Sequence, residues 1–154
     1  MITKIISGGQ TGADLGGLKA AKILGIETGG FAPKNYQTEQ GPNLELKTLY
    51  SLVDVGDDYV SRTIKNVKIS DATVVFSTQP KSVGTLLTLS YCAKFKKPFI
   101  LNPFAGGLRM WLEAHPGIRI LNVAGNRASV DPDAEERTKL TLIEALNSKE
   151  GKEK

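Results

Sequence analysis

The chain has 154 residues, with 20 Lys plus Arg against 16 Asp plus Glu and a formal net charge of +4. This length indicates one domain that needs no disulfide or metal staple, and no apolar run approaches the roughly 20 residues that cross a bilayer. The diffuse basic charge does not indicate a nucleic-acid partner, and a single cysteine with no signal-peptide pattern favours a cytoplasmic protein.

The predicted elements alternate between strand and helix. Short apolar runs predict strands at residues 2–7, 27–32, 72–77, 98–102 and 118–124. Apolar residues at helical spacing predict helices at residues 13–24, 58–70, 85–96 and 108–114 and from Pro132 onward, and Gly25 is the expected C-cap of the first. Residues 33–57 form a connection of a length that is typical of functional loops.

Two helices carry further predictions about burial. In the helix at 58–70 the apolar stripe is Val60, Ile64 and Val67, while Arg62 and Asn66 lie on the opposite side. Three alternatives stay open for that pair: a solvated surface, a subunit contact or the wall of a site. For the last helix the sequence predicts Asp131 as N-cap, Pro132 in the first turn, and three buried residues on the inner face, which are Leu140, Ile143 and Leu146.

Fully apolar strands that alternate with helices predict a mostly parallel sheet covered on both faces. With right-handed crossovers this is an α/β, Rossmann-like doubly wound fold. We expect a single ligand-binding domain over residues 1–147 and a flexible tail over residues 148–154.

The most distinctive motif is Ser-Gly-Gly-Gln-Thr-Gly-Ala-Asp at residues 7–14, between the first strand and the first helix. Glycines let the backbone approach a ligand, and a helix N-terminus offers free N–H groups and a partial positive charge that favour phosphate. A tight turn without a ligand is the alternative. The motif is neither a dinucleotide fingerprint nor a Walker loop, because Ser7 replaces the first glycine and no Gly-Lys-Ser/Thr follows.

Three other loops follow predicted strands. Residues 81–88 place Ser82, Gly84, Thr85 and Thr88 at a helix N-terminus; the alternative is that Ser82 or Thr85 serves only as a helix cap. Arg127, after the last strand, is either an anion clamp or a surface arginine. In the long connection two alternatives stay open for Lys34 and Glu39. Either Lys34 binds a phosphate and Glu39 accepts from a heterocycle N–H, or both side chains are solvated.

Other chemistries lack support. His115 is the only histidine, so neither a histidine-based metal cluster nor a catalytic triad is indicated. Cys92 lies within a predicted helix and is expected in the core. The candidate ligand-binding residues gather on the loops described above; they are Gly8, Gly9, Gln10, Thr11, Gly12, Asp14, Lys34, Glu39, Ser82, Gly84, Thr85, Thr88 and Arg127. No catalytic or metal-ligating residue is predicted.

With these motifs the chain resembles the molybdenum cofactor carrier family, part of a Rossmann-like group that includes the lysine-decarboxylase-like cytokinin-activating proteins. The resemblance runs from Ile2 to about Leu146. It is carried by residues 7–14, 29–34, 39–42, 59, 62–63, 66–67, 70–73, 84–85, 88 and 121–125. Three departures stand out: Val83 before Gly84, Asn126 before Arg127, and Thr88 where cytokinin-activating relatives have a glutamate.

The resemblance implies a homo-oligomer, dimer or tetramer, that binds, protects and carries molybdenum cofactor (molybdopterin). This cargo is a pterin with a terminal phosphate and a dithiolene that holds the metal, and the implied partners are molybdoenzymes or cofactor-biosynthesis proteins. The missing glutamate argues against N-glycosidic catalysis. Two alternatives stay open: an enzyme that processes a nucleotide or ADP-ribose-like ligand with Asp14, Glu39 or Asp71 as acid or base, and a sensor of such a ligand.

Overall fold

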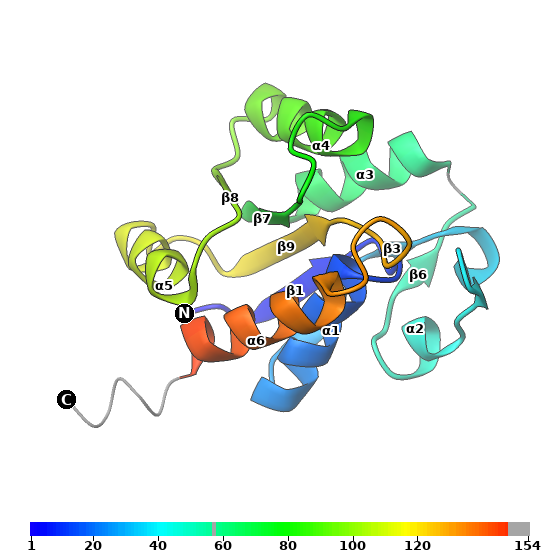
Figure 1. Ribbon diagram of the computed structural model, residues 1–154, viewed down its shortest axis with the longest axis horizontal. Helices are drawn as coiled ribbons and strands as arrows, with labels where there is room; N and C mark the ends of the chain where they lie inside the picture. The colour runs from blue at the N-terminus through cyan, green and yellow to red at the C-terminus, as the bar shows by residue number, and fades with distance from the viewer. Residues whose placement is uncertain (57, 148–154) are drawn as a thin grey trace.

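Five parallel strands form the central sheet of the computed structural model, which describes residues 1–56 and 58–147 (Figure 1). They are β1 (Lys4–Ser7), β2 (Glu27–Gly29), β7 (Ala72–Phe76), β8 (Phe99–Leu101) and β9 (Ile120–Gly125). Their order across the sheet is β2-β1-β9-β7-β8, and every neighbouring pair is parallel. The predicted tail at residues 148–154 lies outside the described residues.

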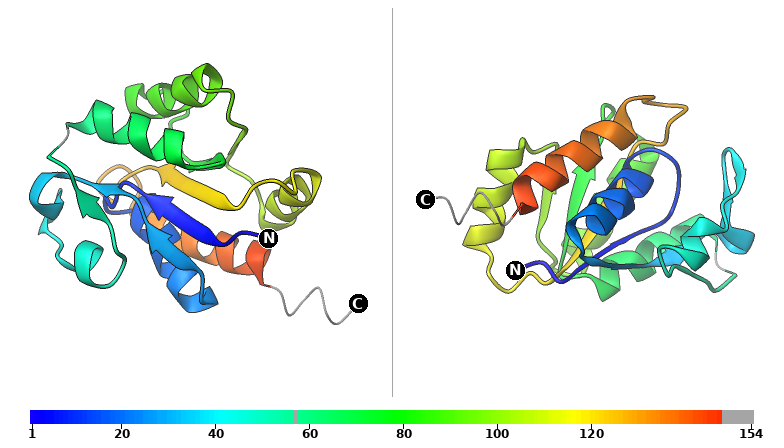
Figure 2. Two further views of the ribbon diagram at one scale, coloured as in Figure 1. Left: turned by 180° about the vertical axis from the view of Figure 1, so that it is seen from behind. Right: turned by 90° about the horizontal axis from the view of Figure 1, so that it is seen from below.

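Helices cover both faces of this sheet (Figures 1 and 2). One face carries α1 (Ala13–Leu24), α5 (Ala105–Ala114) and α6 (Ala134–Leu146), and the other carries α3 (Tyr59–Ile69) and α4 (Val83–Lys94). The core between sheet and helices is apolar and fully buried; it includes Ile5, Val74, Leu108, Leu121, Val123 and Leu142. The predicted Rossmann-like α/β fold is confirmed.

The last strand of the chain lies in the middle of the sheet. Counted from β9, the order across the sheet becomes 3-2-1-4-5, which is the classic dinucleotide-fold order. The sheet is therefore a Rossmann sheet whose first strand and following helix have moved to the carboxyl end of the chain. The switch point, where ligands bind in such folds, lies at the carboxyl ends of β9 and β7.

The predicted strand at 27–32 is broken in two. Gly30 has a φ of 123°, and a Cβ there would lie 2.2 Å from the Ser7 carbonyl oxygen, so the chain turns away from the sheet after β2. Phe31–Ala32 (β3) pairs instead with β6 (Val53–Asp54). Between them lie η1 (Lys34–Tyr36), the hairpin of β4 (Gln37–Thr38) and β5 (Gly41–Pro42), and α2 (Glu45–Thr48). This segment packs through Leu46, Tyr50 and Leu52 on Leu18 of α1.

The boundaries of α1 and α3 agree with the sequence prediction to within a residue, whereas α4 and α5 begin earlier than predicted. Gly25 is the left-handed C-cap of α1, with φ 71°. The Asp58 carboxylate caps α3 by accepting from the Ser61 N–H at 2.7 Å. α4 begins at Val83, two residues earlier than predicted, because the Ser82 hydroxyl accepts from the Thr85 N–H. α5 begins at residue 105, three residues earlier than predicted.

The prediction for the last helix was wrong at its start and for Leu140, whereas Ile143 and Leu146 pack against the core, partly buried. A turn precedes α6, in which Asp131 accepts the N–H groups of Asp133 and Ala134, so the helix begins at residue 134. Leu140 is 54 % exposed, while Leu142 is buried. The inner face of α6 is set by its contact with α1, because Gly16 of α1 lets the α6 backbone come close. A Cβ on Gly16 would lie 2.4 Å from the Glu135 carbonyl oxygen.

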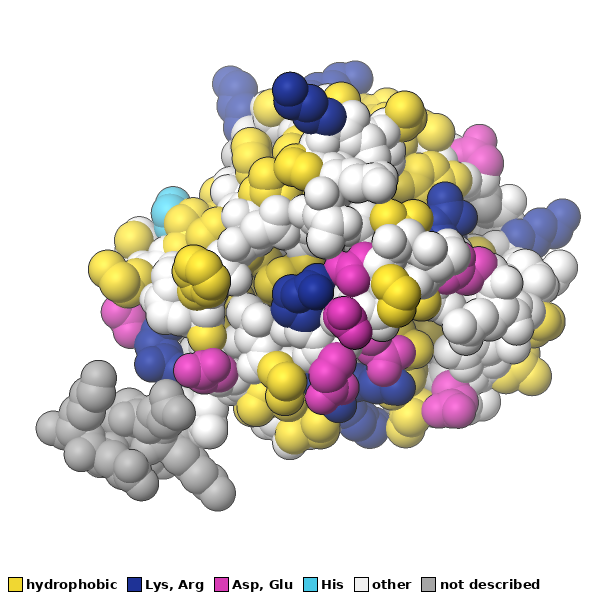
Figure 3. Space-filling view, viewed as in Figure 1, with side chains coloured by type: hydrophobic (Ala, Val, Ile, Leu, Met, Phe, Trp, Pro, Cys, Tyr) yellow, Lys and Arg dark blue, Asp and Glu magenta, His cyan; other side chains and the backbone are white. Residues whose placement is uncertain are grey.

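Ion pairs fasten this same side of the molecule. Figure 3 shows acidic and basic side chains intermixed over α6 and the loop before it. Lys19 of α1 pairs with Glu135 at 2.9 Å, and Arg137 pairs with Asp131 at 2.6 Å. The α4 side differs, because no charged residue occurs from Val83 to Ala93.

The α3 stripe also differs from its prediction. Val60 is 43 % exposed and Val67 is buried, whereas Arg62 and Asn66 are buried at 7 % and 4 % exposure. The Asn66 side chain accepts from the Phe31 N–H at 2.9 Å and donates to the Phe31 carbonyl at 3.3 Å. Polar residues therefore occupy the inner side of α3, because that side faces a polar crevice and the bent β3 segment.

Candidate functional site

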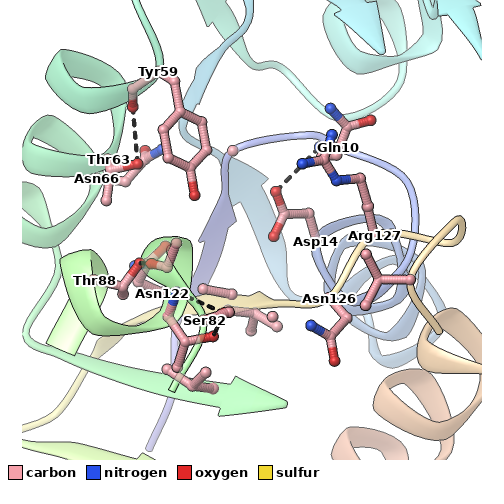
Figure 4. Close-up of a pocket in the computed structure, with 18 of the residues that line it drawn as sticks. Gln10, Asp14, Tyr59, Thr63, Asn66, Ser82, Thr88, Asn122, Asn126 and Arg127 are labelled. Carbon is pink, nitrogen blue, oxygen red and sulfur yellow. Dashed lines mark hydrogen bonds between the residues drawn. The ribbon is translucent and has the colours of Figure 1, made fainter. Parts of the chain in front are cut away.

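A crevice of about 400 Å³ opens at the carboxyl ends of β7 and β9, at the switch point of the sheet (Figure 4). Figure 4 shows Asp14 and Arg127 on one side and Tyr59 and Asn66 on the other. Eight predicted ligand-binding residues line it: Gly8, Gln10, Asp14, Ser82, Gly84, Thr85, Thr88 and Arg127. The tertiary structure thus brings three separate loops to one cavity.

Most backbone donors of the first glycine loop are bonded within the protein, while among the described residues the N–H groups of Gly12 and Asp14 have no acceptor. The Ala13 N–H donates to the Asn126 carbonyl at 3.0 Å, and the Thr11 N–H donates to Gln10 Oε1 at 3.0 Å. The Gln10 N–H donates to Asp14 Oδ2 at 3.1 Å. These three groups are therefore not available to a phosphate at the start of α1.

Two glycines of this loop are explained by packing. Gly12 has a φ of 80°, and a Cβ there would lie 2.1 Å from the Asn126 carbonyl oxygen. Gly9 has a φ of 76°, and its Cβ would collide with Leu46 and Leu52 at 2.9 and 2.8 Å. Neither glycine lines the crevice, so each permits the close approach of another segment and not of a ligand.

The start of α4 is open by contrast. The Ser82 hydroxyl takes the Thr85 N–H, and the Ser82 carbonyl takes the Leu86 N–H. Within the described part of the chain, the N–H groups of Val83 and Gly84 have no acceptor, as expected in the first turn of a helix. Both residues line the crevice, so these donors and the helix dipole present an anion site to it.

A polar network holds this open end in place. Asn126 Oδ1 accepts from the Thr78 N–H at 2.6 Å, and its amide donates to Ser77 Oγ at 3.4 Å. The same Ser77 oxygen lies 3.1 Å from the Thr85 hydroxyl, which also contacts Ser82 at 3.0 Å. The ends of β7 and β9 and the start of α4 therefore form one hydrogen-bonded unit that is ordered before any ligand binds.

Arg62 is a site residue that the set of ligand-binding residues predicted from the sequence does not include. It is 7 % exposed and lines the crevice from α3. Its guanidinium makes no ion pair or hydrogen bond with the described residues, and it lies 5.3 Å from the centre of the Tyr59 ring. A buried, unpaired guanidinium strongly favours an anionic ligand. The sequence did contain a signal for this role. Arg62 lies opposite the predicted apolar stripe of its helix, and the wall of a site was one of the three alternatives for that position.

Asp14 is the only carboxylate among the described residues that line the crevice. Desolvation raises the pKa of this carboxyl to about 6, against the opposing effects of the Gln10 N–H and the Arg62 charge. A carboxyl with so perturbed a pKa in a crevice is typical of functional sites. Asp71 lies at the opposite edge of the sheet, where it accepts the N–H groups of Arg119 and Ile120.

The remaining predicted residues lie outside the crevice. Lys34 is exposed on η1. Glu39, at the tip of the β4–β5 hairpin, accepts hydrogen bonds from the Thr11 hydroxyl and from both the N–H and the hydroxyl of Ser129. These bonds hold the pKa of Glu39 below its ordinary value. Glu39 therefore joins three loops, and Thr11 also accepts from the Ala128 N–H at 3.1 Å.

The described residues contain no group of three or more His, Cys, Asp and Glu side chains placed to hold a metal ion. Cys92 is buried within α4, and burial raises the pKa of its thiol. No described helix is both long and apolar enough to span a membrane.

Comparisons with known proteins agree with this geometry. The sequence model of the circularly permutated YpsA SLOG family matches residues 5–146. None of the curated proteins matches the chain. A crystal structure of a "Putative molybdenum carrier protein" from Syntrophus aciditrophicus SB superposes with a TM-score of 0.83, at 35% sequence identity over 94% of this chain and 95% of that one. The central position of the last strand is the permutation that the family description names.

Proposed function

The chain belongs to the circularly permutated YpsA SLOG family, and on that basis we propose that it binds and carries molybdenum cofactor in the crevice between β7 and β9. The name of the similar Syntrophus protein, a molybdenum carrier, supports this choice of cargo. The proposal includes a homo-oligomer in the cytoplasm that passes the cofactor to molybdoenzymes or receives it from biosynthetic proteins.

The observation that carries the proposal is the unpaired guanidinium of Arg62 in the same crevice as the open N–H groups of Val83 and Gly84. A charged donor and two backbone donors suit the terminal phosphate of the cofactor. Each such hydrogen bond to a charged group contributes about 1.5–3 kcal/mol.

The crevice also suits a cargo that brings its own metal ligands. No cysteine or histidine occurs among the described residues that line it, and the dithiolene sulfurs of the pterin would hold the metal. What the protein must supply is a phosphate site and polar groups for the heterocycle. Gln10, Asp14 and Asn122 provide the latter.

The test is to purify the protein under reducing, oxygen-free conditions from a host that makes molybdenum cofactor. Molybdenum is counted by elemental analysis, and the pterin is counted as its fluorescent oxidation product. We expect near-equal molar amounts with the wild type, at least a tenfold loss with Arg62→Gln, and no loss with Arg119→Gln. Arg119 is exposed at the opposite edge of the sheet and so provides the matched control. Recovery of a nucleotide without pterin would contradict the proposal.

A second candidate, hydrolysis of a nucleotide-like ligand, is favoured by Asp14 alone. A carboxyl with a pKa of about 6 is suited to general acid–base work. Thr88, however, lies where the cytokinin-activating relatives have a glutamate, and its hydroxyl is engaged with the Gly84 carbonyl at 3.1 Å. Turnover of a nucleotide panel that is lost in Asp14→Asn would establish this candidate, and absence of turnover across the panel would exclude it.

A further inference from the structure

Asp14 has one carboxylate oxygen free to meet a ligand. Oδ2 accepts the Gln10 N–H at 3.1 Å, and among the described residues Oδ1 has no hydrogen-bond partner. A carboxylate oxygen has two lone pairs, so both oxygens can still accept from outside the protein. Asp14 lines the crevice and is half-buried, so its carboxylate has lost part of its hydration.

Arg62 lies beside this carboxylate but is not paired with it. Asp14 Oδ2 and Arg62 Nε lie 3.1 and 3.5 Å from the point where a Cβ on Gly8 would stand. The two groups make no ion pair, so each keeps its hydrogen-bonding capacity for a third party. The crevice thus offers a ligand an acceptor at Asp14 and donors at Arg62 and the start of α4.

The acceptor selects a particular kind of heterocycle. Pterins and guanine share an amino-pyrimidine edge on which a ring N–H and an exocyclic NH₂ point the same way. A carboxylate accepts both bonds side by side, just as it accepts the two donors of an arginine fork. Adenine has a ring acceptor beside its NH₂ group, and this acceptor would repel the carboxylate. Hypoxanthine has the ring N–H but lacks the NH₂ group.

We propose that Asp14 determines specificity by accepting the N–H and NH₂ groups of an amino-pyrimidine edge, while Arg62 and the α4 N-terminus take the phosphate. This inference rests on the proposed function in placing the cargo in the same crevice, and it adds which end of the cargo meets which wall. It assigns the closed first loop to the heterocycle and the open second loop to the anion.

In the Asp14→Asn variant a hydrogen-bond donor should replace the acceptor that faces the crevice. The Gln10 N–H requires an acceptor, so the asparagine oxygen will turn to it and the asparagine NH₂ will face the crevice. A donor then meets the donor edge of the ligand. We expect the variant to reject the amino-pyrimidine edge without losing the phosphate site.

The experiment measures affinity for the fluorescent, phosphate-bearing oxidation product of the cofactor, with GMP, IMP and AMP as competitors. GMP and IMP differ only in the NH₂ group. For the wild type we expect GMP to bind about tenfold or more tightly than IMP, and AMP to bind weakest. For Asp14→Asn we expect the GMP-to-IMP ratio to fall to about 1 and pterin affinity to fall about tenfold or more, whereas inorganic phosphate affinity is retained or rises, because a negative charge near Arg62 is removed.

The matched control is Asp133→Asn, an exposed aspartate before α6 whose replacement makes the same change of charge. A wild type without preference for GMP over IMP, or an Asp14→Asn variant that keeps the preference or the pterin affinity, would overturn the inference. Its failure is separable from that of the carrier function. If cofactor copurifies equally with the wild type and with Asp14→Asn, the carrier function stands and this inference fails. If the preference for GMP depends on Asp14 but no cofactor copurifies, this inference stands and the carrier function fails.

Discussion

The loops at residues 7–14 and 81–85 look alike in the sequence and behave differently in the structure. Both follow a strand, both contain glycine and hydroxyl residues, and both lead into a helix. In the first loop the amide of Ala13 is bonded to Asn126, whereas in the second the amides of Val83 and Gly84 remain open. The glycine-richer motif is thus the more closed of the two, with the amides of Gly9, Gln10, Thr11 and Ala13 bonded and only those of Gly12 and Asp14 without an acceptor among the described residues.

The difference shows that glycine content does not measure readiness for a ligand. Gly9 and Gly12 allow Leu52 and the Asn126 backbone to come close, so the absence of a side chain at these positions serves packing and not ligand binding. The cap of α4 is the Ser82 side chain, which accepts from one backbone N–H, that of Thr85, and leaves the N–H groups of Val83 and Gly84 without an acceptor among the described residues. Donors that a fold has not used are the better indicator of an anion site.

The largest effect is expected from a change that breaks the closed loop. In Gly12→Ala the new methyl group meets the Asn126 oxygen at 2.1 Å with φ at 80°. We expect a loss of about 3 kcal/mol or more in the free energy of unfolding, measured by urea denaturation. Gly25→Ala is the control, because its φ is 71° but no atom lies within 4 Å, and it should cost about 1 kcal/mol. Equal losses in the two variants would show that Gly12 has no packing role.

The carboxylate of the closed loop should make stability depend on pH. The pKa of Asp14 is about 6 in the folded protein, above its ordinary value, so between about pH 4 and 6 the folded state binds more protons than the unfolded state. Stability therefore falls as pH rises through this window. The loss is at most about 3 kcal/mol.

Asp14→Asn removes this dependence. Its stability relative to the wild type should rise from pH 4 to pH 6 and then stay constant, as measured by denaturation at a series of pH values. The Asp133→Asn control should run parallel to the wild type across the same window. A flat difference between Asp14→Asn and the wild type would contradict the raised pKa.

One donor of the open loop can be deleted without disturbing the helix. Proline is favoured at the first position of a helix, and Ser82 already has the extended conformation that a following proline requires, with φ −63° and ψ 152°. Val83→Pro should keep the stability of the wild type and weaken phosphate binding about five- to tenfold, as measured by calorimetry. Ala105→Pro makes the same change at the start of α5, outside the crevice, and should leave phosphate affinity unchanged.

The smallest effect is expected at the hairpin that fastens the closed loop. In Glu39→Gln an NH₂ group replaces the oxygen that accepts from the Ser129 hydroxyl. We expect a loss of stability of about 1 kcal/mol or less, since the carboxylate is exposed. The clearer readout is faster hydrogen exchange at the amides of Ala128 and Ser129, with Glu45→Gln of α2 as the control. Unchanged exchange would mean that Glu39 does not hold this loop.

The alternation of strands and helices, the Gly25 cap, and a hydroxyl cap before α4 at either Ser82 or Thr85 could be predicted, because each depends on hydrophobic periodicity or on contacts within a few residues. Eight of the thirteen predicted ligand-binding residues line the crevice, since the carboxyl ends of parallel strands share one edge. The start of α6 and the exposure of Leu140 could not be predicted, because the α1 glycines decide how α6 packs.

The sequence by itself determined the fold class, the parallel sheet and the loops among which a ligand site must lie, since periodicity and turn chemistry are local. Only the tertiary structure decided that the last strand enters the middle of the sheet, that Arg62 is buried without a partner among the described residues, and that the first loop is more closed than the start of α4. The physical reason is that a backbone N–H stays free or becomes hydrogen-bonded according to which distant segment packs against it. The acceptor of the Ala13 N–H is the carbonyl of Asn126, which is over a hundred residues away in the sequence.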